Sequence, residues 1–220
     1  LAGQIPAHAI GRGYGHLHEM PDQLGVLRGL TKHAARIAGP HDAAVTVAGA
    51  VHLALSGRRR PVALECAMDV WARSGPAPDA TPVPPVTPAV DPDAIERAAR
   101  ILGAARRPLI VVGGGAEDAA PELRQVAELL EAPVVSYRRG RGILPTEHRL
   151  AVSYPVGHRL WAGADAVLAV GTRLYAPQAA WGTDADVQIV RLDVDPEEPD
   201  RYQPPACAIV ADAAAGLRAL

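Results

Sequence analysis

Residues 106–116, RRPLIVVGGGA, and residues 164–174, ADAVLAVGTRL, are the two stretches that decide the fold of this chain. In each, an apolar run typical of a buried strand ends at glycine, and the sequence between them predicts a helix and a further strand. Strand, glycine turn and helix in this order build a parallel α/β sheet with a nucleotide-sized crevice at its strand ends. The two stretches therefore predict an α/β domain.

The same alternation continues on both sides of these stretches. Asp91 followed by Pro92 is typical of a helix start, and the apolar residues after it recur on one helical face. Strands that alternate with helices predict a parallel sheet covered on both faces. Strands are expected at residues 109–112, 133–136, 166–170, 188–194 and 208–210, and helices after residue 92, around residues 123–130 and near residues 156–162.

Seven prolines between residues 76 and 92 divide the chain. They exclude a helix and remove backbone donors, which predicts an extended, semi-rigid linker over residues 76–91. Upstream, the pattern predicts a helix over residues 43–55 and a buried strand near residues 62–66, while the first forty residues are expected to hold loops and short helices. The expected domains are residues 1–75 and 92–220.

The composition of the chain argues against several kinds of partner and indicates a compartment. The 22 Lys and Arg against 24 Asp and Glu leave a net charge of −2, which gives no basis for nucleic acid or an anionic membrane as a partner. No apolar run reaches the ~18 residues of a membrane span. Cys66 and Cys207 are expected to be free, buried thiols in a reducing compartment, so the expected localisation is cytoplasmic.

The glycine turn and an acidic strand end could bind a nucleotide. Gly113, Gly114 and Gly115 could let a diphosphate approach the following helix, although they lack the GxGxxG spacing and tight turning explains them equally well. Asp193 and Asp195 could accept hydrogen bonds from ribose hydroxyls, or Asp195 could simply start a helix. Both interpretations stay open at this point.

The segment GHLHEMPDQ, residues 15–23, carries His16, His18 and Glu19. It is not an HExxH motif, and Pro21 prevents the long helix that such a zinc site requires, so no metal site is expected. The segment is either a polar loop that lines a substrate or cofactor pocket or an ordinary surface loop.

Eight segments occur in the order found in thiamine diphosphate (ThDP) enzymes of the acetolactate synthase type, and together they resemble that family over nearly the whole chain. The segments are residues 3–11, 17–37, 54–70, 106–116, 131–150, 163–174, 190–198 and 209–220. The resemblance implies a Rossmann-like central domain with a parallel sheet, preceded by the C-terminal part of a second α/β domain that binds the aminopyrimidine ring of ThDP.

The resemblance also implies that this chain lacks the family's activation machinery. The glutamate that protonates the aminopyrimidine is expected upstream of Leu1, and the GDG-to-NN segment that holds Mg²⁺ and the diphosphate is expected beyond Leu220. No catalytic residue is therefore expected in the chain. Gln4 matches the family's TGQ-type loop near ThDP, and His18 falls in the loop that follows, so both are expected to line the pocket.

The central domain of this family holds FAD in some members, another nucleotide in others and nothing in the rest. Flavin-bearing members continue Gly-x-Arg with Phe-Asp-Asp, whereas here Gly171, Thr172 and Arg173 are followed by Leu-Tyr-Ala, so FAD is not expected. The residues expected at the crevice, which could be vestigial, are Gly113, Gly114, Gly115, Gly171, Thr172, Arg173 and Asp193.

The resemblance implies a fragment of a ThDP- and Mg²⁺-dependent decarboxylase or carboligase that acts on a small-molecule 2-keto acid, as a homodimer or homotetramer when full length. The alternative is a nucleotide- or flavin-binding module without ThDP chemistry, similar to electron-transfer flavoproteins or sirtuins. A structural remnant used for dimerisation is a third possibility.

Overall fold

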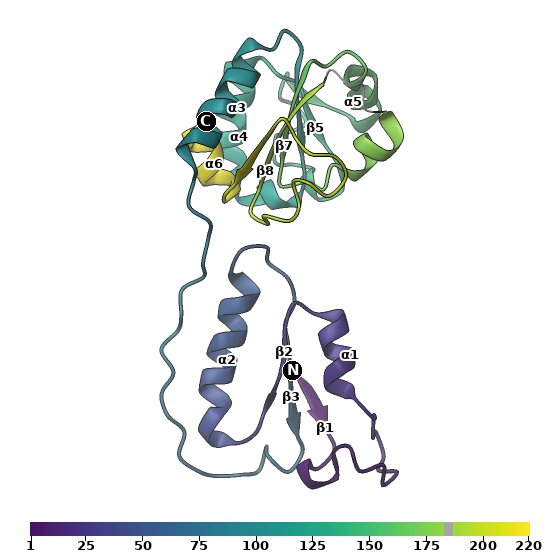
Figure 1. The fold of residues 1–220 in the computed structure, drawn as a ribbon, viewed down its shortest axis with the longest axis vertical. Coiled ribbons are helices and arrows are strands. Elements are labelled where there is room, and N and C mark those ends of the chain that lie inside the picture. Colours follow the sequence, from purple (N-terminus) through teal and green to yellow (C-terminus); the bar gives the residue numbers. More distant parts are fainter. Residues whose placement is uncertain (183–186) are drawn as a thin grey trace. The chain divides into compact units, whose positions relative to one another are not determined.

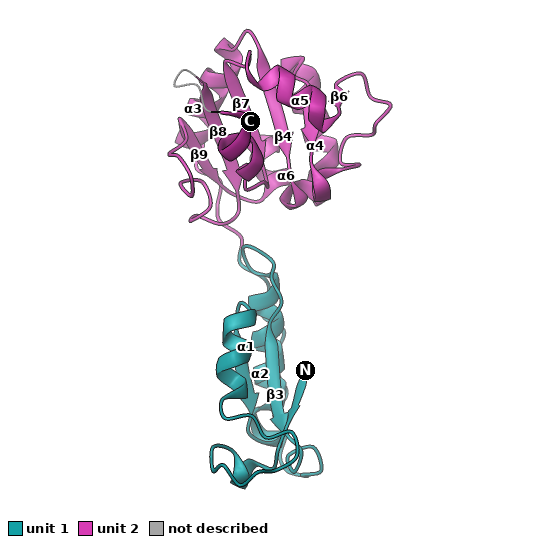
Figure 2. Ribbon diagram, turned by 90° about the vertical axis from the view of Figure 1, so that its right-hand side faces the viewer, with its two compact units in different colours: residues 1–86 teal, residues 87–220 magenta. Residues whose placement is uncertain are grey.

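A computed structural model describes residues 1–182 and 187–220 of the chain. The chain forms two compact units, residues 1–86 and residues 87–220 (Figures 1 and 2). Each unit contains one parallel β-sheet with helices packed against it. Both units are therefore α/β, as the sequence predicts.

The first unit has a three-stranded parallel sheet in the order β1-β3-β2. The central strand β3 (Ala63–Ala67) is buried along its whole length. Its neighbours are β1 (Ala2–Gln4) and β2 (Ala34–Ile37). The helices α1 (Gln23–Leu30) and α2 (Pro40–Leu55) lie on opposite sides of this sheet (Figures 1 and 2).

The side chains of β3 alternate between the two helices, as the pleat of a strand requires. Leu64 and Cys66 belong to the apolar cluster that includes Ala50 of α2. Glu65, between them, accepts a hydrogen bond from Gln23 of α1. The face under α2 is thus apolar, and the face under α1 contains a buried carboxylate.

The expectation that the first forty residues hold only loops and short helices is wrong for two segments, β1 and β2. Both are very short and rich in small residues, so neither has the run of β-branched or aromatic residues that marks a strand in a sequence. Ala2 of β1 pairs with Glu65, and Ala34 of β2 pairs with Ala63, so the register of both strands is fixed by β3. These strands form because β3 gives them a partner.

The proline-rich segment has no helix or strand between residues 76 and 91. Its first part belongs to the first unit, because it runs along α2. Pro84 O lies 2.9 Å from Nδ1 of His52, and the N–H of Val86 donates to Oγ of Ser56 at 3.0 Å. The boundary between the compact units accordingly falls after Val86.

The second unit has a six-stranded sheet in which every neighbouring pair is parallel, in the order β6-β5-β4-β7-β8-β9. From β4 the chain adds β5 and β6 toward one edge of the sheet. It then crosses back to β7, which pairs with the other side of β4, and adds β8 and β9 toward the opposite edge. The strands are β4 (Pro108–Val112), β5 (Val134–Ser136), β6 (Ala151–Val152), β7 (Ala166–Val170), β8 (Gln188–Asp193) and β9 (Cys207–Val210).

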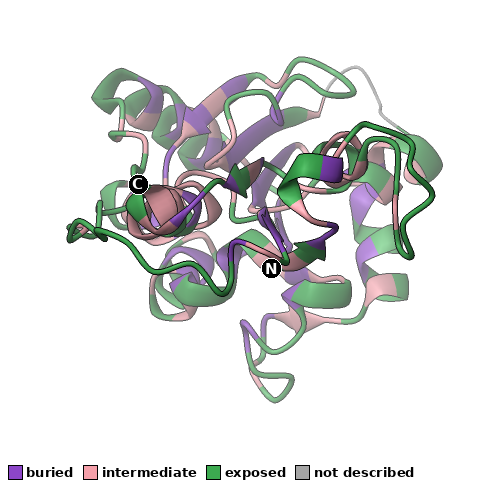
Figure 3. Cartoon of the chain, turned by 90° about the horizontal axis from the view of Figure 1, so that it is seen from below, coloured by how far each residue is buried: buried purple, intermediate pink, exposed green. Residues whose placement is uncertain are grey.

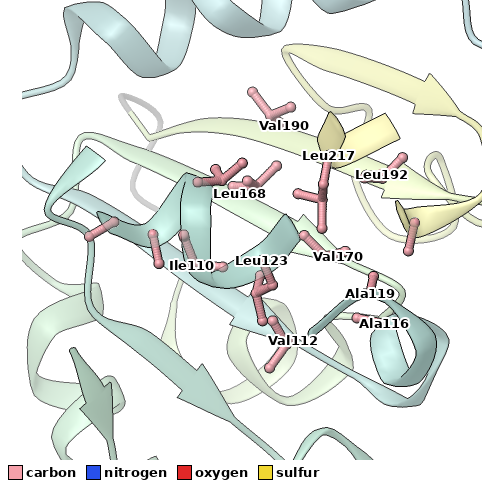
Figure 4. Packing of buried hydrophobic residues seen from close by; sticks show 14 of the residues in the cluster. Ile110, Val112, Ala116, Ala119, Leu123, Leu168, Val170, Val190, Leu192 and Leu217 are labelled. Atoms are coloured by element: carbon pink, nitrogen blue, oxygen red, sulfur yellow. The ribbon is translucent and has the colours of Figure 1, made fainter. Parts of the chain in front are cut away.

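Helices cover both faces of this sheet, as expected for parallel strands. One face packs against α3 (Pro92–Ala104), α4 (Ala120–Leu130) and α6 (Ala213–Ala219), and Figure 4 shows Leu123 and Leu217 meeting its apolar side chains. The other face packs against α5 (Tyr154–Trp161). Alternate residues of β4 point into the two layers: Ile110 and Val112 into the first, Leu109 and Val111 into the second.

In Figure 3 the buried positions are concentrated in the strands, whereas the long loops are exposed. Among the described residues, none of the helices has the length and apolar character required to cross a lipid bilayer.

Candidate functional site

Gln4 is the last residue of β1 and lies at the carboxyl end of the first sheet. It is buried, and its Oε1 accepts the backbone N–H of Ile5 at 2.8 Å. Its carbonyl accepts the N–H of Met68, which follows β3, at 2.9 Å. Within the described part of the chain, no hydrogen bond of Gln4 Nε2 is found, so this amide keeps a donor at the strand end.

The loops after β1 and β3 are joined at this edge. Oδ1 of Asp69 accepts the N–H of Ala7 at 2.8 Å, and Asp69 also forms an ion pair with Arg73, four residues later. The N–H of Ala7 and the Arg73 guanidinium together hold the pKa of Asp69 below its ordinary value. The backbone around Gln4 is therefore fixed from both sides.

A glycine-rich loop follows at the same edge. Gly11, Gly13 and Gly15 all have left-handed backbones, with φ of 73°, 68° and 74°, and His18 adopts φ of 69° although it is not glycine. Alternation of left-handed with ordinary residues turns successive N–H groups toward one point and forms an anion-binding concavity.

Glu19 of the same loop fills this concavity. Its Oε1 accepts the N–H of Gly13 and its Oε2 the N–H of His16, each at 2.9 Å. Backbone N–H groups, with that of His16 first, hold the pKa of Glu19 below its ordinary value. The Glu19 carboxylate is thus an anion, supplied by the loop itself, that accepts hydrogen bonds from the N–H groups of the loop.

His18 is an exposed residue of this loop. Its neighbours Leu17 and Tyr14 are also exposed, Leu17 to 83% and Tyr14 to 66%. Gln4 and His18 therefore belong to one edge of one sheet, Gln4 as a buried residue at the strand end and His18 as an exposed residue in the loop.

Two residues before the carboxyl end of β3, in the middle of this strand, the carboxylate of Glu65 is fully buried. It accepts hydrogen bonds from Nε of Arg36 at 2.5 Å and from Nε2 of Gln23 at 3.2 Å. Nε2 of Gln23 also donates to the carbonyl of Gly3 at 3.0 Å. This network joins α1, β1, β2 and β3, and a paired carboxylate of this kind is compatible with full burial.

In the second unit, the glycines after β4 and β7 contact each other directly. A Cβ placed on Gly113 would lie 2.5 Å from the carbonyl oxygen of Gly171, and one placed on Gly115 would lie 2.7 Å from Cα of Gly171. Gly171 has φ of 54°, and its own added Cβ would lie 2.4 Å from the carbonyl carbon of Gly115. The absence of side chains here allows two backbone turns to pack together.

The N–H groups of these turns already have acceptors. Gly113 donates to Val170 O at 3.0 Å, Gly115 to Gly171 O at 2.9 Å, and Gly171 to Leu192 O at 2.9 Å. A diphosphate would need such N–H groups to be available at the helix start. In this conformation the three glycine amides hold the sheet edge together.

The remaining predicted crevice residues are less constrained. Gly114 packs against Arg139: a Cβ placed on Gly114 would lie 3.0 Å from the Cβ of Arg139. Oγ1 of Thr172 accepts the N–H of Leu174 at 3.2 Å. Arg173 is exposed, and Asp193 ends β8 beside the turn, where its Oδ1 accepts the N–H of Asp195 at 3.0 Å. The structure brings the glycines, Thr172 and Asp193 to one edge.

Two buried residues near these positions were not predicted. Arg191 of β8 is buried, and its NH2 donates to Thr172 O at 2.8 Å; burial lowers its pKa. Glu198 is equally buried and pairs with Nε of Arg201 at 3.0 Å. Charged residues inside a strand and a loop carry no periodic signal. For Glu19, in contrast, the sequence held a usable signal: the alternate glycines at residues 11, 13 and 15 indicate a loop whose N–H groups can bind a carboxylate.

These features define an α/β protein with a Rossmann-like second unit and candidate binding residues at the carboxyl ends of both sheets. Residues 95–220 match the family model described as thiamine pyrophosphate enzyme, central domain. Because this match covers more than half of the chain, the chain belongs to the thiamine pyrophosphate enzymes, thiamine pyrophosphate being another name for ThDP.

Similar proteins include decarboxylases and a synthase. The chain is 32% identical to the probable 2-ketoarginine decarboxylase AruI of Pseudomonas aeruginosa, covering 96% of this chain and 39% of the relative. It is 30% identical to oxalyl-CoA decarboxylase of Escherichia coli, covering 92% and 38%. It is 29% identical to the acetolactate synthase large subunit of Corynebacterium glutamicum, covering 97% and 36%. The chain thus spans well under half the length of these curated relatives.

The fold has a solved counterpart. An X-ray structure described as a thiamin diphosphate-dependent enzyme isolated from Mycobacterium smegmatis superposes with a TM-score of 0.83 at 21% identity. The match covers 98% of this chain and 44% of the other. At this identity the likeness concerns the fold, and it agrees with the parallel-sheet α/β architecture of both units.

Proposed function

We propose that these 220 residues are part of a longer ThDP- and Mg²⁺-dependent enzyme that decarboxylates or joins 2-keto acids. The observation that carries the proposal is the family match over residues 95–220, supported by relatives named as decarboxylases and synthases that align with 92–97% of the chain. In the proposed enzyme, residues 1–75 belong to the domain that holds the aminopyrimidine ring, and the enzyme works as a cytoplasmic homodimer or homotetramer.

The carboxyl edge of the first sheet fits a role at the cofactor. Nε2 of Gln4 offers a donor at the end of β1, while Oε1 is tied to Ile5 N–H, so the amide is oriented before any ligand arrives. We assign Gln4 to a polar atom of ThDP or of its bound substrate. ThDP, when bound, supplies the thiazolium electron sink that allows a carboxylate to leave a 2-keto acid as CO₂.

We assign His18 to the substrate side of the same pocket. It is an exposed donor and acceptor in a loop whose backbone is fixed by hydrogen bonds, which favours a defined position for its ring. The exposed apolar residues beside it, Leu17 and Tyr14, would exclude water from a bound keto acid.

The activating glutamate and the Mg²⁺-diphosphate segment are assigned to sequence outside these residues. No GDG-to-NN segment occurs here, and the chain spans only 36–39% of the length of the relatives compared above. By this proposal the 220-residue chain alone has no useful affinity for ThDP and no catalytic residue.

The alternative, a nucleotide- or flavin-binding module, has weaker support. The N–H groups of Gly113, Gly115 and Gly171 are bonded to carbonyl oxygens, so the glycine turns do not fit a diphosphate in this conformation. A nucleotide would depend on Arg173, Thr172 and Asp193. We therefore derive no step through FAD or another nucleotide.

The proposed activity is tested with purified full-length protein, ThDP and Mg²⁺. CO₂ release is measured from pyruvate, from a basic 2-keto acid and from oxalyl-CoA, since the relatives include enzymes named for the last two kinds of substrate. We expect ThDP-dependent CO₂ release from at least one 2-keto acid. Release that does not depend on ThDP, or a tightly bound flavin without any ThDP-dependent release, would favour the alternative.

A further inference from the structure

The loop over residues 11–19 contains one charged group that determines its conformation. The carboxylate of Glu19 accepts the N–H groups of Gly13 and His16, at opposite ends of the concavity. The N–H of Glu19 returns to the carbonyl of His16 at 2.9 Å. Both the side chain and the backbone of Glu19 are therefore hydrogen-bonded to His16, two residues before His18.

His18 has a backbone that few residues other than glycine adopt. Its φ of 69° is unfavourable for a side chain with a Cβ, and such a conformation persists only where the surroundings enforce it. Here His18, although exposed, lies in the sequence between His16 and Glu19, and two hydrogen bonds join those two residues. The backbone conformation at His18 thus depends on the hydrogen bonds that Glu19 makes.

We infer that Glu19 is a positioning residue, whose carboxylate holds loop 11–19 so that His18 faces the 2-keto acid substrate. This inference rests on the proposed function, which places His18 at the pocket. Glu19 acts through the loop backbone, because each of its two carboxylate oxygens accepts a backbone N–H of the loop.

No ion pair of Glu19 is found in residues 1–182 and 187–220, so its partners are amides and not cations. The other titratable groups of the loop are Arg12, Tyr14, His16 and His18. The ring of His8 lies 6.5 Å from that of His16, and Asp22 is at the start of α1. Charge at Glu19 favours the N–H bonds, and loss of that charge weakens them.

The substitution Glu19→Gln preserves size and removes the charge. A glutamine can present one carbonyl oxygen to one N–H, but its NH₂ group must then face the second N–H, and two donors repel. Asp22→Asn is the matched control. Asp22 also accepts a backbone N–H, that of Gly25 at 2.8 Å, but it caps α1, and asparagine is an equally good cap.

The first measurement is amide hydrogen exchange in the 220-residue chain, which needs no cofactor. In Glu19→Gln we expect the amides of Gly13 and His16 to exchange about tenfold faster or more, while Asp22→Asn leaves them unchanged. Equal exchange in the wild type and Glu19→Gln would overturn the inference, since the carboxylate would then not be holding the loop.

The second measurement is a double-mutant cycle on kcat/KM in the full-length enzyme. We expect Glu19→Gln to lower kcat/KM about tenfold in the wild type and to have little further effect in His18→Ala, because it acts through His18. An equal loss in both backgrounds would overturn the positioning role while leaving the enzyme's activity intact. If His18→Ala alone has no effect, the pocket assignment fails, and the inference fails with it.

Discussion

Gly171 is the residue at which backbone geometry and packing constrain the second unit most tightly. An added Cβ would meet the backbone of Gly115 at 2.4 Å, and φ of 54° disfavours any side chain. Gly142 is a suitable control, because its φ is also positive, at 87°, but nothing lies within 4 Å of an added Cβ. The two glycines separate the conformational requirement from the packing requirement.

We expect Gly171→Ala to lower the free energy of unfolding by about 3–5 kcal/mol, the sum of left-handed strain and a backbone clash. Gly142→Ala should cost about 1–2 kcal/mol, from strain alone. Urea unfolding followed by tryptophan fluorescence measures both, with Trp71 of the first unit replaced by Phe in every protein so that only Trp161 and Trp181 report. Equal costs would show that the turns move apart readily and that their contact is not what requires glycine.

Asp165 lies at the amino end of β7 and ties it to β4. Its carboxylate accepts the N–H groups of Arg106 at 2.8 Å and Arg107 at 2.9 Å. Burial opposes its ionisation, but these N–H groups outweigh burial and hold its pKa below the ordinary value of 3.8.

Because the pKa of Asp165 is lowered on folding, its contribution to stability is complete above pH 3.8 and is lost as the pH falls through the folded-state pKa. Asp165→Asn removes this titration. We expect urea midpoints of the wild type to fall more steeply than those of the variant when the pH is lowered below 3.8. Parallel curves would contradict a role for this carboxylate in acid sensitivity.

At the scale of elements, the carboxyl terminus of α2 is capped by Lys32, the one lysine of the chain. Its Nζ donates to the carbonyls of Leu53 at 2.7 Å, Ser56 at 2.6 Å and Arg58 at 3.1 Å. A cation at this end both satisfies unpaired carbonyls and interacts favourably with the helix dipole.

We expect Lys32→Met to lower the free energy of unfolding of the first unit by about 1–2 kcal/mol. Arg28→Met removes the same charge from an exposed position in the last turn of α1 and should cost about 0.5 kcal/mol or less. Circular dichroism during urea unfolding compares them. Similar small losses in both would mean that the cap contributes little.

The elements that the sequence predicted well are those with long or strongly apolar signals. β4 and β7 were recognisable because each is an uninterrupted apolar run, and α3 because its apolar residues repeat on one face. β1 and β2 were missed because three or four small residues carry no periodicity. Their existence depends on pairing with β3, which is tertiary information.

At the candidate site, the roles predicted for Gln4 and His18 stay predictions, and the sequence indicated only part of the arrangement around them. The resemblance pointed to Gln4 and His18, and both lie at the same sheet edge. Glu19 was considered only together with His16 and His18, as a metal ligand that the motif argues against and as part of a polar loop. Its bonding to the loop amides was missed, because the anion-binding concavity arises from backbone torsions that residue types only suggest. The bonding of the glycine amides of residues 113, 115 and 171 to carbonyls depends on strand register, which the sequence alone does not determine.

At the scale of the whole molecule, the proline-rich segment should separate two protease-resistant units. Val83 and Val86 are exposed to 53% and 63% and lie before the boundary between the units. We expect limited thermolysin digestion, followed by mass spectrometry, to cut first within residues 76–91. First cleavage inside residues 109–135 would place a weak point within the second sheet and contradict the boundary.

The central claim is that this chain contributes the carboxyl edge of its first sheet to a ThDP pocket. Calorimetric titration of full-length protein with ThDP and Mg²⁺ tests it most directly. We predict micromolar binding that weakens about tenfold in Gln4→Ala, from loss of an oriented donor, and is unchanged in Gln188→Ala, an exposed glutamine at the amino end of β8. No binding of ThDP by the full-length protein, or equal binding by wild type and Gln4→Ala, would contradict the account.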